Sequence, residues 1–555
     1  MSSISIVLVP HIGHLYSAVL ADVLRRWYEF KGHKAILSTG TDEHGQKIQE
    51  AAAKQGISPR VFCDDISKEF KKLFDTANIS YTDYIRTTDA RHKEAVHALW
   101  KRLSDAGHIY KGHHEGWYSV SDETFVPSNQ LEEIVAPDGR KSMISKESGN
   151  PVVWTKEENY KFRLGAFREN LLKWLRSNPD CEHQHVVPPP LNMKLINSAA
   201  IIPKLRYNEI VAALSDSDDH LTDLSVSRVR SRLQWGIPVP GDEDHVVYVW
   251  LDALTNYLTV TGYPWKTAEQ QALKDAWPAQ SHVIGKDIIK FHAIYWPAFL
   301  MAAGLPLPKQ IIAHGHWLMG DHKMSKSRGN VVDPYKLLEK FGADPVRYYF
   351  VRDGGIAYDG AFAFKEVAKR YRKDLADQLG NLVMRCASKK VNPAMEAPRE
   401  PDAMTDFETA LIKKLESLRE SFTENIERAD FASATEQVYE TVLEGNHYWD
   451  ATQPWLLAKA AYSKTAPDPT AETRLQTVLY FTFETVRIAA LMLQPIMPTK
   501  MAKLLDDLGV EKEERRWENA EIGRRWRVVG ADQGQNTKIS KMEPLFPKWD
   551  EEFDD

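Results

Sequence analysis

The sequence is poor in cysteine, with only 3 in 555 residues. Cys63, Cys181 and Cys386 are far apart in the chain, so neither a disulfide framework nor a thiolate zinc site is supported. No apolar run reaches the length of a transmembrane helix, and we expect no membrane partner. An excess of basic residues is also missing, because the net charge is −6. Any contact with nucleic acid must therefore be confined to part of the surface.

A targeting segment is missing from the printed sequence too. The chain starts almost directly on a predicted strand, without an Arg- and Ser-rich transit segment or a signal peptide. What is present is an ordinary globular composition, 43% hydrophobic and 27% charged. Because 555 residues are too many for one core, we expect three or four domains.

The beginning of the chain predicts a strand–loop–helix–strand unit. A β-branched run from Ile4 to Val9 predicts the first strand. An amphipathic segment from Leu15 to Lys31 predicts the helix, with Gly32 at its end. The run from Ala35 to Ser38 predicts the second strand, after which Asp89 to Ala106 is among the segments with a helical period.

The loop of this unit is Pro10-His11-Ile12-Gly13-His14. Such a loop lies at the carboxyl end of a strand, where α/β sheets place anionic ligands against a helix N-terminus. The two imidazoles can point the same way, and Gly13 leaves bare backbone for a flat base to approach. The loop therefore indicates a nucleotide triphosphate site, with a pair of ordinary surface or core histidines as the alternative.

A second motif, Lys323-Met324-Ser325-Lys326-Ser327, follows a predicted strand from Gln310 to Ala313. A Lys/Ser run in a loop is usually solvated surface, but paired with the first motif it fits triphosphate binding. The pair resembles the HIGH and KMSKS motifs of class I aminoacyl-tRNA synthetases, and the surrounding sequence resembles the methionyl-tRNA synthetases. The resemblance extends from His11 into the C-terminal half and thins after about Met492.

The resemblance implies ATP-dependent ligation of methionine to its tRNA through a methionyl-adenylate, with ATP and Mg²⁺ as cofactors. The methionine carboxylate is already ionised at neutral pH, so its attack on the α-phosphate needs no general base. The step needs positioning and positive charge at the phosphates. The resemblance assigns catalysis to His11, His14, Lys323 and Lys326. It assigns ATP binding to Pro10, His11, Gly13, His14, Lys323, Met324, Ser325, Lys326 and Ser327.

A methionine pocket is also implied by the resemblance. Asp42 matches the position that holds the substrate's amino group. It lies in the run Gly40 to Gly45, which follows the second predicted strand. The alternative for such a run, and the commoner one, is a helix N-cap and its turn. Predicted strands at Val246 to Val249 and Ser281 to Ile284 lead to the aromatic positions, which on spacing alone would be core. The implied methionine-binding residues are Asp42, Trp250, Ala253, Tyr257, Asp287, Ile288, His292 and Trp296.

Short strands and turns from Gly112 onward, such as Gly116 to Val120, resemble the family's connective insertion. No cysteine pair stands at ligand spacing, so we expect no zinc and no other metal site; the remaining candidate ligands are His113, His114, His183 and His185. The stretch from Glu182 to Lys204 matches nothing in the family. We interpret it as an insertion or an error in the gene model.

From Asp333 onward the chain is predicted to be mainly helical. Asn381, Arg385 and Trp455 match the family's anticodon-reading positions, where aromatics stack on unpaired bases and polar groups bond their edges. The alternative for Trp455, which follows a proline at a predicted helix start, is packing.

The resulting fold class is α/β, a Rossmann-like parallel-sheet catalytic domain with an inserted connective domain, followed by an all-α anticodon-binding helical bundle. The expected domains are 1–112 and 222–330 for the two catalytic halves, 113–221 for the insertion with the unmatched stretch 182–204, 331–380 for a stem-contact linker, and 381–555 for the anticodon-binding domain. The expected partners are the methionine tRNA, L-methionine and ATP. We expect a monomer in the mitochondrial matrix, with the cytoplasm as the alternative.

Two other functions fit parts of the sequence. A nucleotidyltransferase of the same fold would bind no tRNA, which the long helical half disfavours. An RNA-binding relative without catalysis is disfavoured by the intact lysine motif.

One departure from the family predicts weak methionine affinity with ATP binding largely preserved. The family carries a Tyr–x–Asn in its first strand, which forms part of the methionine site, whereas Ser5 and Val7 stand at these positions here. Methionine-dependent ATP–pyrophosphate exchange measures the effect. Saturation by methionine at the concentrations usual for the family would contradict the prediction.

Overall fold

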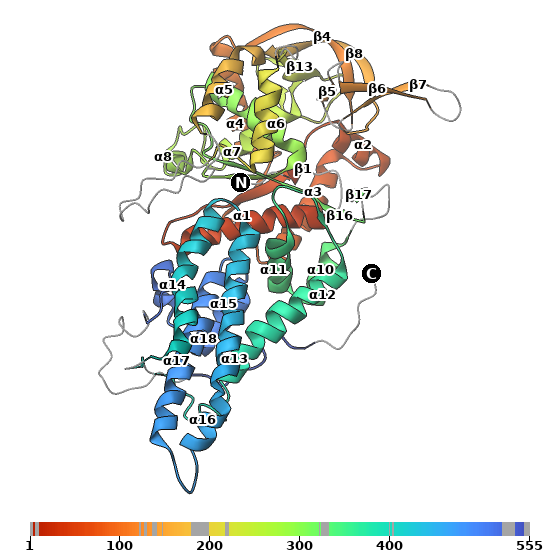
Figure 1. Cartoon of the computed structure of the whole chain (residues 1–555). Helices are drawn as coiled ribbons and strands as arrows, with labels where there is room; N and C mark the ends of the chain where they lie inside the picture. Colours follow the sequence, from red (N-terminus) through yellow and green to blue (C-terminus); the bar gives the residue numbers. More distant parts are fainter. Residues whose placement is uncertain are drawn as a thin grey trace. The chain divides into compact units, whose positions relative to one another are not determined.

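The structure is a computed structural model that describes residues 4–5, 10–120, 124–126, 130–135, 141–146, 148–178, 199–216, 221–320, 322–323, 332–398, 400–401, 404–523 and 539–548 (Figure 1). The chain forms two compact units, of which the first comprises Met1–Pro10, Ile36–Asp75 and Ser80–His314 and the second His11–Ala35, Thr76–Ile79 and Gly315–Asp555. Among these described ranges, no helix combines the length and the apolar character needed to cross a membrane.

The first unit contains two sheets of parallel strands. One has the order β1 (Ile4–Ser5), β2 (Ser38–Asp42), β3 (Asp83–Arg86), and the other has the order β14 (His282–Gly285), β15 (Ile311–His314), β9 (Ile201–Ile202). All pairs in both sheets are parallel. The predicted strands at Ser281 to Ile284 and Gln310 to Ala313 are thereby confirmed. Within the described residues the sheets are separate, so a single Rossmann-like sheet stays a prediction.

The second strand of the chain begins later than predicted. Only Ser38 of the expected run from Ala35 to Ser38 lies in β2, which continues to Asp42 and is buried along its whole length. A Cβ added at Gly40 would lie 1.8 Å from the carbonyl oxygen of Ile85 in β3. Glycine therefore lets the two strands approach, a tertiary reason that hydrophobic pattern alone does not reveal.

The helices that follow are α2 (Gln46–Lys54), α3 (Pro59–Thr76) and α4 (Ala90–Asp105). A helix from Asp89 to Ala106 was expected and is confirmed by α4. Between α2 and α3 the chain turns at Gly56, whose φ is +68°. This left-handed conformation favours glycine and ends a helix.

Antiparallel strands make up the part of the first unit expected to be inserted. Four of them form one sheet with the strand order β10, β8, β4, β5. Strands β6 and β7 form a separate two-stranded hairpin. The predicted strand from Gly116 to Val120 is the end of the much longer β4. Two helices, α5 and α6, follow. Their bounds are Ile109–Ser119 for β4, Thr124–Val126 for β5, Leu131–Val135 for β6, Lys141–Ser145 for β7, Val153–Phe162 for β8, Leu224–Ser225 for β10, Arg168–Ser177 for α5 and Lys204–Ser215 for α6.

The stretch from Glu182 to Lys204 has structure at its end. Residues 179–198 lie outside the described residues, but β9 pairs in parallel with β15, Ile201 opposite Ile311. The interpretation of the stretch as an insertion or an error in the gene model stays a prediction, but its last residues, Ile201 and Ile202, belong to a sheet of the first unit. Their pairing with β15 is a contact distant in sequence, which local pattern does not report.

The expected buried strand from Val246 to Val249 is also corrected. The strand is β13 (Asp242–Val247), and it lies in an antiparallel sheet between β11 (Ser227–Val229) and β12 (Pro238–Val239) rather than in a parallel sheet. Val249 already belongs to α7 (Val249–Thr259), which is buried on nearly all sides. A short apolar run fits a strand and a buried helix equally well, which explains the error. A short helix, α8 (Ala268–Gln271), follows.

The second unit begins with α1 (Ile12–Phe30), in agreement with the predicted helix. At its end the amides of Gly32 and His33 donate to the carbonyls of Glu29 and Tyr28, and Gly32 has a φ of +82°. The predicted glycine stop is confirmed. The unit also has a small sheet of β16 (Trp317–Met319), β17 (His322–Lys323) and β18 (Gly360–Ala361).

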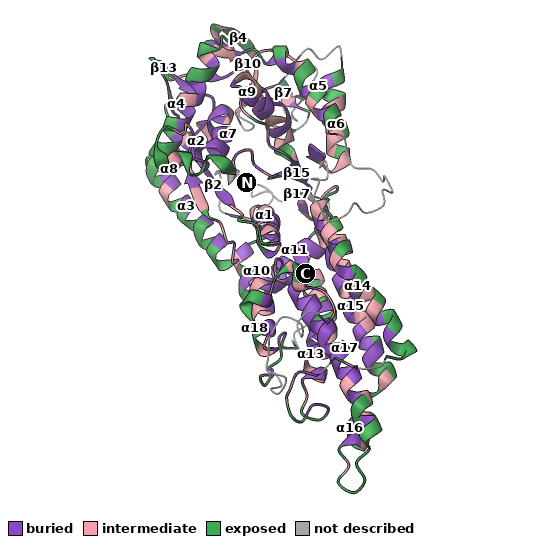
Figure 2. Cartoon of the chain, turned by 90° about the vertical axis from the view of Figure 1, so that its left-hand side faces the viewer, coloured by how far each residue is buried: buried purple, intermediate pink, exposed green. Residues whose placement is uncertain are grey.

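From Asp333 onward most of the described residues of the second unit are helical, as predicted. Capping residues determine where several helices begin. The Asp333 carboxylate accepts a hydrogen bond from Tyr335 N, and the Asp468 carboxylate accepts one from Thr470 N. Most residues of the long helix α17 are buried, and it shows mainly purple in Figure 2. The helices are α10 (Pro334–Phe341), α11 (Ala343–Asp353), α12 (Phe364–Arg370), a π-helix (Tyr371–Gly380) leading into α13 (Asn381–Cys386), α14 (Asp406–Glu427), α15 (Phe431–Thr452), α16 (Pro454–Ala461), α17 (Pro469–Leu493) and α18 (Pro498–Asp507).

Candidate functional site

The two histidines of the first motif cap helix α1. The Nδ1 atom of His11 accepts a hydrogen bond from Gly13 N at 3.1 Å, and the Nδ1 atom of His14 lies 3.3 Å from His11 N, which donates to it. The rings stack with centroids 3.7 Å apart. A Cβ at Gly13 would lie 3.0 Å from the His11 ring, so glycine keeps this arrangement free of crowding.

This arrangement decides what the histidines offer to a ligand. Because both Nδ1 atoms accept hydrogen bonds, the proton of each neutral ring is on Nε2. Burial and the neighbouring His11 lower the pKa of His14 well below its ordinary value, so His14 is neutral at physiological pH. Two Nε2–H donors at a helix N-terminus fit a phosphate. Pro10, the first residue of the motif, is the last residue of the segment Met1–Pro10 of the first unit.

The second motif is described only at its start. Lys323 ends β17, where it pairs with Leu318 of β16. Its side chain, and all of Met324, Ser325, Lys326 and Ser327, lie outside the described residues. The roles given to these residues stay predictions.

Asp42 is the last residue of β2 and is 6% exposed. It was predicted to lie just past a strand; instead the strand includes it, and its carboxylate stands at the carboxyl end of a parallel sheet. That edge is where α/β sheets bind ligands. The N-cap alternative is not supported, because α2 begins at Gln46 with Gly45 as its N-cap.

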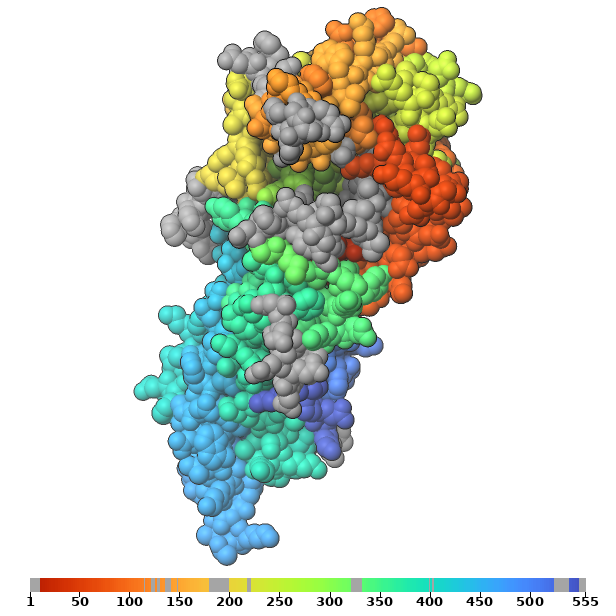
Figure 3. Space-filling view, turned by 90° about the vertical axis from the view of Figure 1, so that its right-hand side faces the viewer, coloured from red at the N-terminus to blue at the C-terminus, as the bar shows by residue number. Residues whose placement is uncertain are grey.

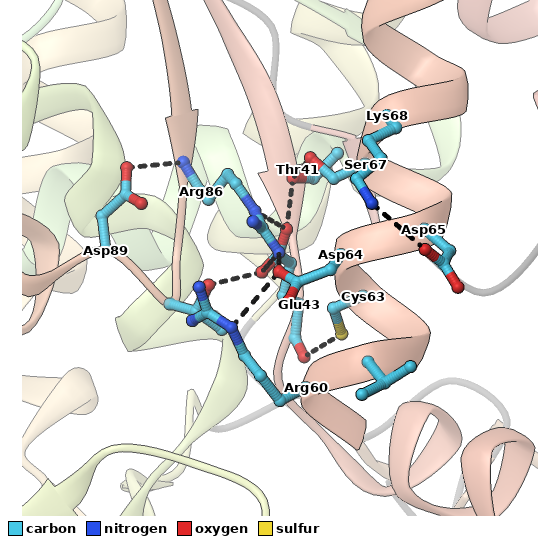
Figure 4. Close-up of polar contacts among 12 residues, drawn as sticks. Thr41, Glu43, Arg60, Cys63, Asp64, Asp65, Ser67, Lys68, Arg86 and Asp89 are labelled. Atoms are coloured by element: carbon cyan, nitrogen blue, oxygen red, sulfur yellow. Dashed lines mark hydrogen bonds and ion pairs between the residues drawn. The ribbon is translucent and has the colours of Figure 1, made fainter. Parts of the chain in front are cut away.

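A buried network fixes the chain directly after Asp42 (Figure 4). The fully buried Glu43 carboxylate accepts from Nε and Nη2 of Arg86 at 2.6 and 3.0 Å, and from the hydroxyls of Thr41 and Thr88. Its carbonyl accepts from the Trp235 indole N–H and from the Cys63 thiol. Every polar group of Glu43 is thus engaged, which holds Asp42 and His44 on either side of it in one conformation.

The aromatic positions predicted for the methionine pocket gather in the first unit. Tyr257 and His292 share a hydrogen bond of 2.7 Å between Oη and Nε2, and the Nδ1 atom of His292 lies 2.9 Å from the Ile288 carbonyl. A carbonyl only accepts, so the His292 proton is on Nδ1 and Tyr257 donates to Nε2. Burial lowers the pKa of His292 to about 4, which keeps the ring neutral at pH 7.

Tryptophans complete this cluster. Trp296 is fully buried, with its ring 6.0 Å from that of Tyr257, and Trp250 stacks on Phe291 at 3.6 Å. In the described part of the chain, the buried indole N–H groups of Trp250 and Trp296 have no hydrogen-bond partner. Ala253 is buried on α7 and Ile288 is half-buried, whereas the Asp287 side chain is exposed.

The helix that carries His292 differs from the expected one. Ile288, His292 and Trp296 were expected on one face of a regular α-helix. The chain instead forms a π-helix from Phe291 to Tyr295 before α9 (Trp296–Ala302). The wider turn shifts the side chains relative to α-helical spacing, and such segments are frequent at functional sites.

The predicted tRNA-binding residues lie in the second unit. Arg385, at the end of α13, contacts the side chains of Asn446 and Asp450 of α15 at 3.5 and 3.3 Å. Trp455 lies in the first turn of α16, directly after α15 ends at Thr452, and is 46% exposed. That exposure argues against the packing alternative. Asn381, the first residue of α13, is half-buried.

Sequence reasoning missed three residues that the structure brings together at α7. His44 and His92 both contact the carboxylate of Asp252, which lies between Trp250 and Ala253 on α7. The run from Gly40 to Gly45 was a signal for His44. Nothing in the local sequence singles out His92, because its partner is 160 residues away in the chain.

Two family models match the chain: tRNA synthetases class I (M) over residues 7–387, and the anticodon-binding domain of methionyl tRNA ligase over residues 398–553. A probable mitochondrial methionine–tRNA ligase of Dictyostelium discoideum is 43% identical, over 91% of this chain and 84% of that protein. The mitochondrial methionine–tRNA ligase of Homo sapiens is 43% identical, over 91% and 82%. The methionine–tRNA ligase of Rhizobium meliloti (strain 1021) is 40% identical, over 97% and 95%.

The fold is also similar to a solved structure, Mycobacterium tuberculosis methionyl-tRNA synthetase bound by methionyl-adenylate. The TM-score is 0.85 and the identity 37%, over 98% of this chain and 99% of the other. Together with the two family models, this shows that the chain belongs to the methionyl-tRNA synthetases of class I.

Proposed function

We propose that this chain ligates methionine to its tRNA through methionyl-adenylate, with ATP as its Mg²⁺ complex. The observation that carries the proposal is the neutral, aromatic-walled Tyr257–His292 cluster in the same unit as the buried Asp42. Aminoacylation of purified tRNA pools with each amino acid in turn tests it. Charging by methionine alone is the expected result, and charging by another amino acid would refute it.

The methionine site combines an apolar pocket with one acidic end. A thioether is apolar and polarizable, and contacts with aromatic edges stabilise its sulfur by about 0.3–1.5 kcal/mol each. Because His292 is neutral, the pocket presents no charge to the thioether. The Asp42 carboxylate suits the substrate ammonium group, while Trp250, Ala253, Tyr257, Ile288 and Trp296 form the wall. Asp287 lies at the exposed edge of this set.

Adenylate formation needs donors on both sides of the α-phosphate. The Nε2–H groups of His11 and His14 at the start of α1 would donate to the phosphate oxygens. Lys323 and Lys326, with Ser325, Ser327 and the backbone around Met324, would neutralise the leaving pyrophosphate. A terminal ribose hydroxyl of tRNA then attacks the adenylate carbonyl and releases AMP.

Anticodon recognition is proposed for the end of the helical bundle that carries α16. This end forms a narrow tip of the second unit in Figure 3 and is largely exposed in Figure 2. The contact from Arg385 to Asp450, close to the end of α15, brings Arg385 to the helix end from which α16 continues. Arg385 and Asn381 would bond base edges there, and Trp455 would stack on a base.

Replacing Trp455 by alanine should weaken the use of cognate tRNA by about 1–3 kcal/mol, the range for one lost base stack. ATP–pyrophosphate exchange should stay nearly intact, because it requires no tRNA. Leu456→Ala is the matched control, since Leu456 is similarly exposed, at 52%, but cannot stack as an aromatic ring. Equal losses of charging and exchange in the Trp455 variant would show a structural role instead.

A nucleotidyltransferase without tRNA charging is the second candidate, and it is not favoured. The anticodon-binding model covers residues 398–553, for which such an enzyme has no use. Pyrophosphate exchange without any tRNA charging would support it.

Further properties are proposed with the function. The Rossmann-like fold and the domain bounds given above apply to the catalytic half, supported by its parallel strands. A monomeric state and the absence of zinc are part of the proposal. The zinc proposal is supported by the cysteine positions, because Cys63 and Cys386 are both buried and lie far apart in the sequence. A mitochondrial location is supported by the names of the relatives from Dictyostelium discoideum and Homo sapiens.

A further inference from the structure

Asp252 holds two histidines in the interior of the first unit. Its fully buried carboxylate has Oδ2 at 2.7 Å from Nδ1 of His44 and Oδ1 at 2.8 Å from Nε2 of His92. Burial raises the pKa of this carboxyl, but the interaction with His44 and the hydrogen bonds from both rings outweigh burial, and the net shift is downward. The carboxylate is therefore ionised at neutral pH and accepts from both imidazoles.

This partner determines the tautomer of the His44 ring. An ionised carboxylate only accepts hydrogen bonds, so Nδ1 of His44 carries a proton, and in the neutral ring Nε2 is then a bare acceptor. Among the described residues, no group hydrogen-bonds Nε2 of His44, although the residue is only 5% exposed. The Trp235 ring lies next to the His44 ring, with centroids 5.5 Å apart. An acceptor without a partner in a largely buried residue is stabilised when a ligand supplies a donor.

The direction of the chain places His44 on the same side as Asp42. In extended backbone, side chains two residues apart point to the same face. Thr41 and Glu43 demonstrate this on one face, because the Thr41 hydroxyl donates to Glu43 at 2.8 Å. The alternation of Thr41 and Glu43 indicates that Asp42 and His44 share the opposite face, and on that face His44 contacts Asp252 of α7.

We propose that His44 is a further substrate-binding residue, whose Nε2 accepts a hydrogen bond from the ammonium group of methionine beside Asp42. Asp252 is then a positioning residue that sets the tautomer of His44. An ammonium group has three N–H donors, more than one carboxylate satisfies in a fixed geometry. A neutral imidazole adds an acceptor without a second negative charge. This inference rests on the proposed methionine site.

The experiment removes Nε2 while keeping the contact to Asp252. His44→Asn retains an amide N–H near the place of Nδ1 and has no counterpart of Nε2. Binding is measured by tryptophan fluorescence titration with methionine, with methioninol, which keeps the ammonium group, and with 4-(methylthio)butanoate, which lacks it. We expect affinity for the first two ligands to fall about tenfold or more, as for a lost hydrogen bond to a charged group. Affinity for the third should change by less than about twofold.

Asp252→Asn tests the positioning role. An amide at this place also donates to Nδ1, which moves the imidazole proton to Nε2 and removes the acceptor. The same ligand-specific loss is expected. Asp242→Asn is the matched control, because Asp242 Oδ2 lies 3.0 Å from Nδ1 of His245 in the same unit, outside the predicted pocket. Its binding constants should stay those of the unchanged chain.

Different outcomes test the role of His44 and the proposed methionine–tRNA ligase function. Equal losses for all three ligands, or unchanged affinity for methionine, would overturn the role of His44. If His44→Asn does not fold, two other variants are compared. The amide oxygen of His44→Gln replaces Nε2 as an acceptor, so this variant must bind methioninol more tightly than His44→Ala. The opposite order would overturn the role of His44. Failure of the unchanged chain to bind methionine or to exchange pyrophosphate would refute the proposed function itself.

Discussion

Alanine in place of Lys326 should slow the formation of methionyl-adenylate by about 2–4 kcal/mol in activation free energy, which is roughly thirtyfold to a thousandfold. Lys323→Ala should act in the same direction. Negative charge moves onto the pyrophosphate as it leaves, so a lysine at this place acts more strongly on the transition state than on the ground state. Methionine binding should change much less, because the lysines act on the phosphates.

Pre-steady-state measurement of adenylate formation, with methionine and ATP saturating, separates the two effects. Lys336→Ala is the control: Lys336 is an exposed lysine on α10, shortly after the motif in the chain. Its removal lowers the local positive charge equally and should leave the rate within about twofold, since exposed charges at a distance are screened. An unchanged rate constant in both motif variants would refute their assignment to the leaving group.

Local signals of the sequence predicted the helices well. The amphipathic period and Gly32 placed α1, and the same period placed α4, because caps and periodicity act within a few residues. Strand positions were less accurate. The location of β2 depends on the approach of β3 at Gly40, and the pairing of β9 with β15 joins residues far apart in the chain. Neither contact leaves a local pattern.

The candidate site shows the same division. Residues carried by motifs, such as His11, His14 and Asp42, could be selected from the sequence, as could the aromatic positions around His292, and their roles stay predictions. The π-helix at Phe291–Tyr295 was not predicted, because one additional residue in a turn does not change composition or apolar pattern. The links from Asp252 to two histidines are tertiary hydrogen bonds and appear only in the folded chain.

Asp22→Asn should destabilise helix α1 by about 3–5 kcal/mol, the usual cost of removing one partner from a buried ion pair. Asp22 and Arg347 are both fully buried, and Oδ2 of Asp22 lies 2.6 Å from Nη2 of Arg347 on α11. Arg26 contacts the same carboxylate at 2.7 Å. Asparagine keeps the size of the side chain and one acceptor, so the change isolates the charge.

The remaining partners of Arg347 explain why the effect is large. Its guanidinium donates to the carbonyls of Ile496 and Pro495 at 2.8 and 3.0 Å, which satisfy its hydrogens but not its charge. Burial lowers the pKa of Arg347 and the charge of Asp22 counteracts this. Arginine nevertheless stays protonated in proteins. Without Asp22 the buried positive charge faces carbonyl dipoles and one more distant carboxyl, that of Asp344.

Amide hydrogen exchange of peptides from α1 and α11 measures this effect directly, because it reports local opening in a chain with two units. The control is Glu29→Gln on the same helix. Glu29 forms an ion pair with Arg25, and its side chain is 41% exposed. Such a pair should contribute less than about 1 kcal/mol to stability. Since α1 begins at the His11–His14 pair, faster opening of α1 should also lower pyrophosphate exchange in the Asp22 variant and not in the control. Unchanged protection of α1 would show that the two arginines are stabilised without the carboxylate charge.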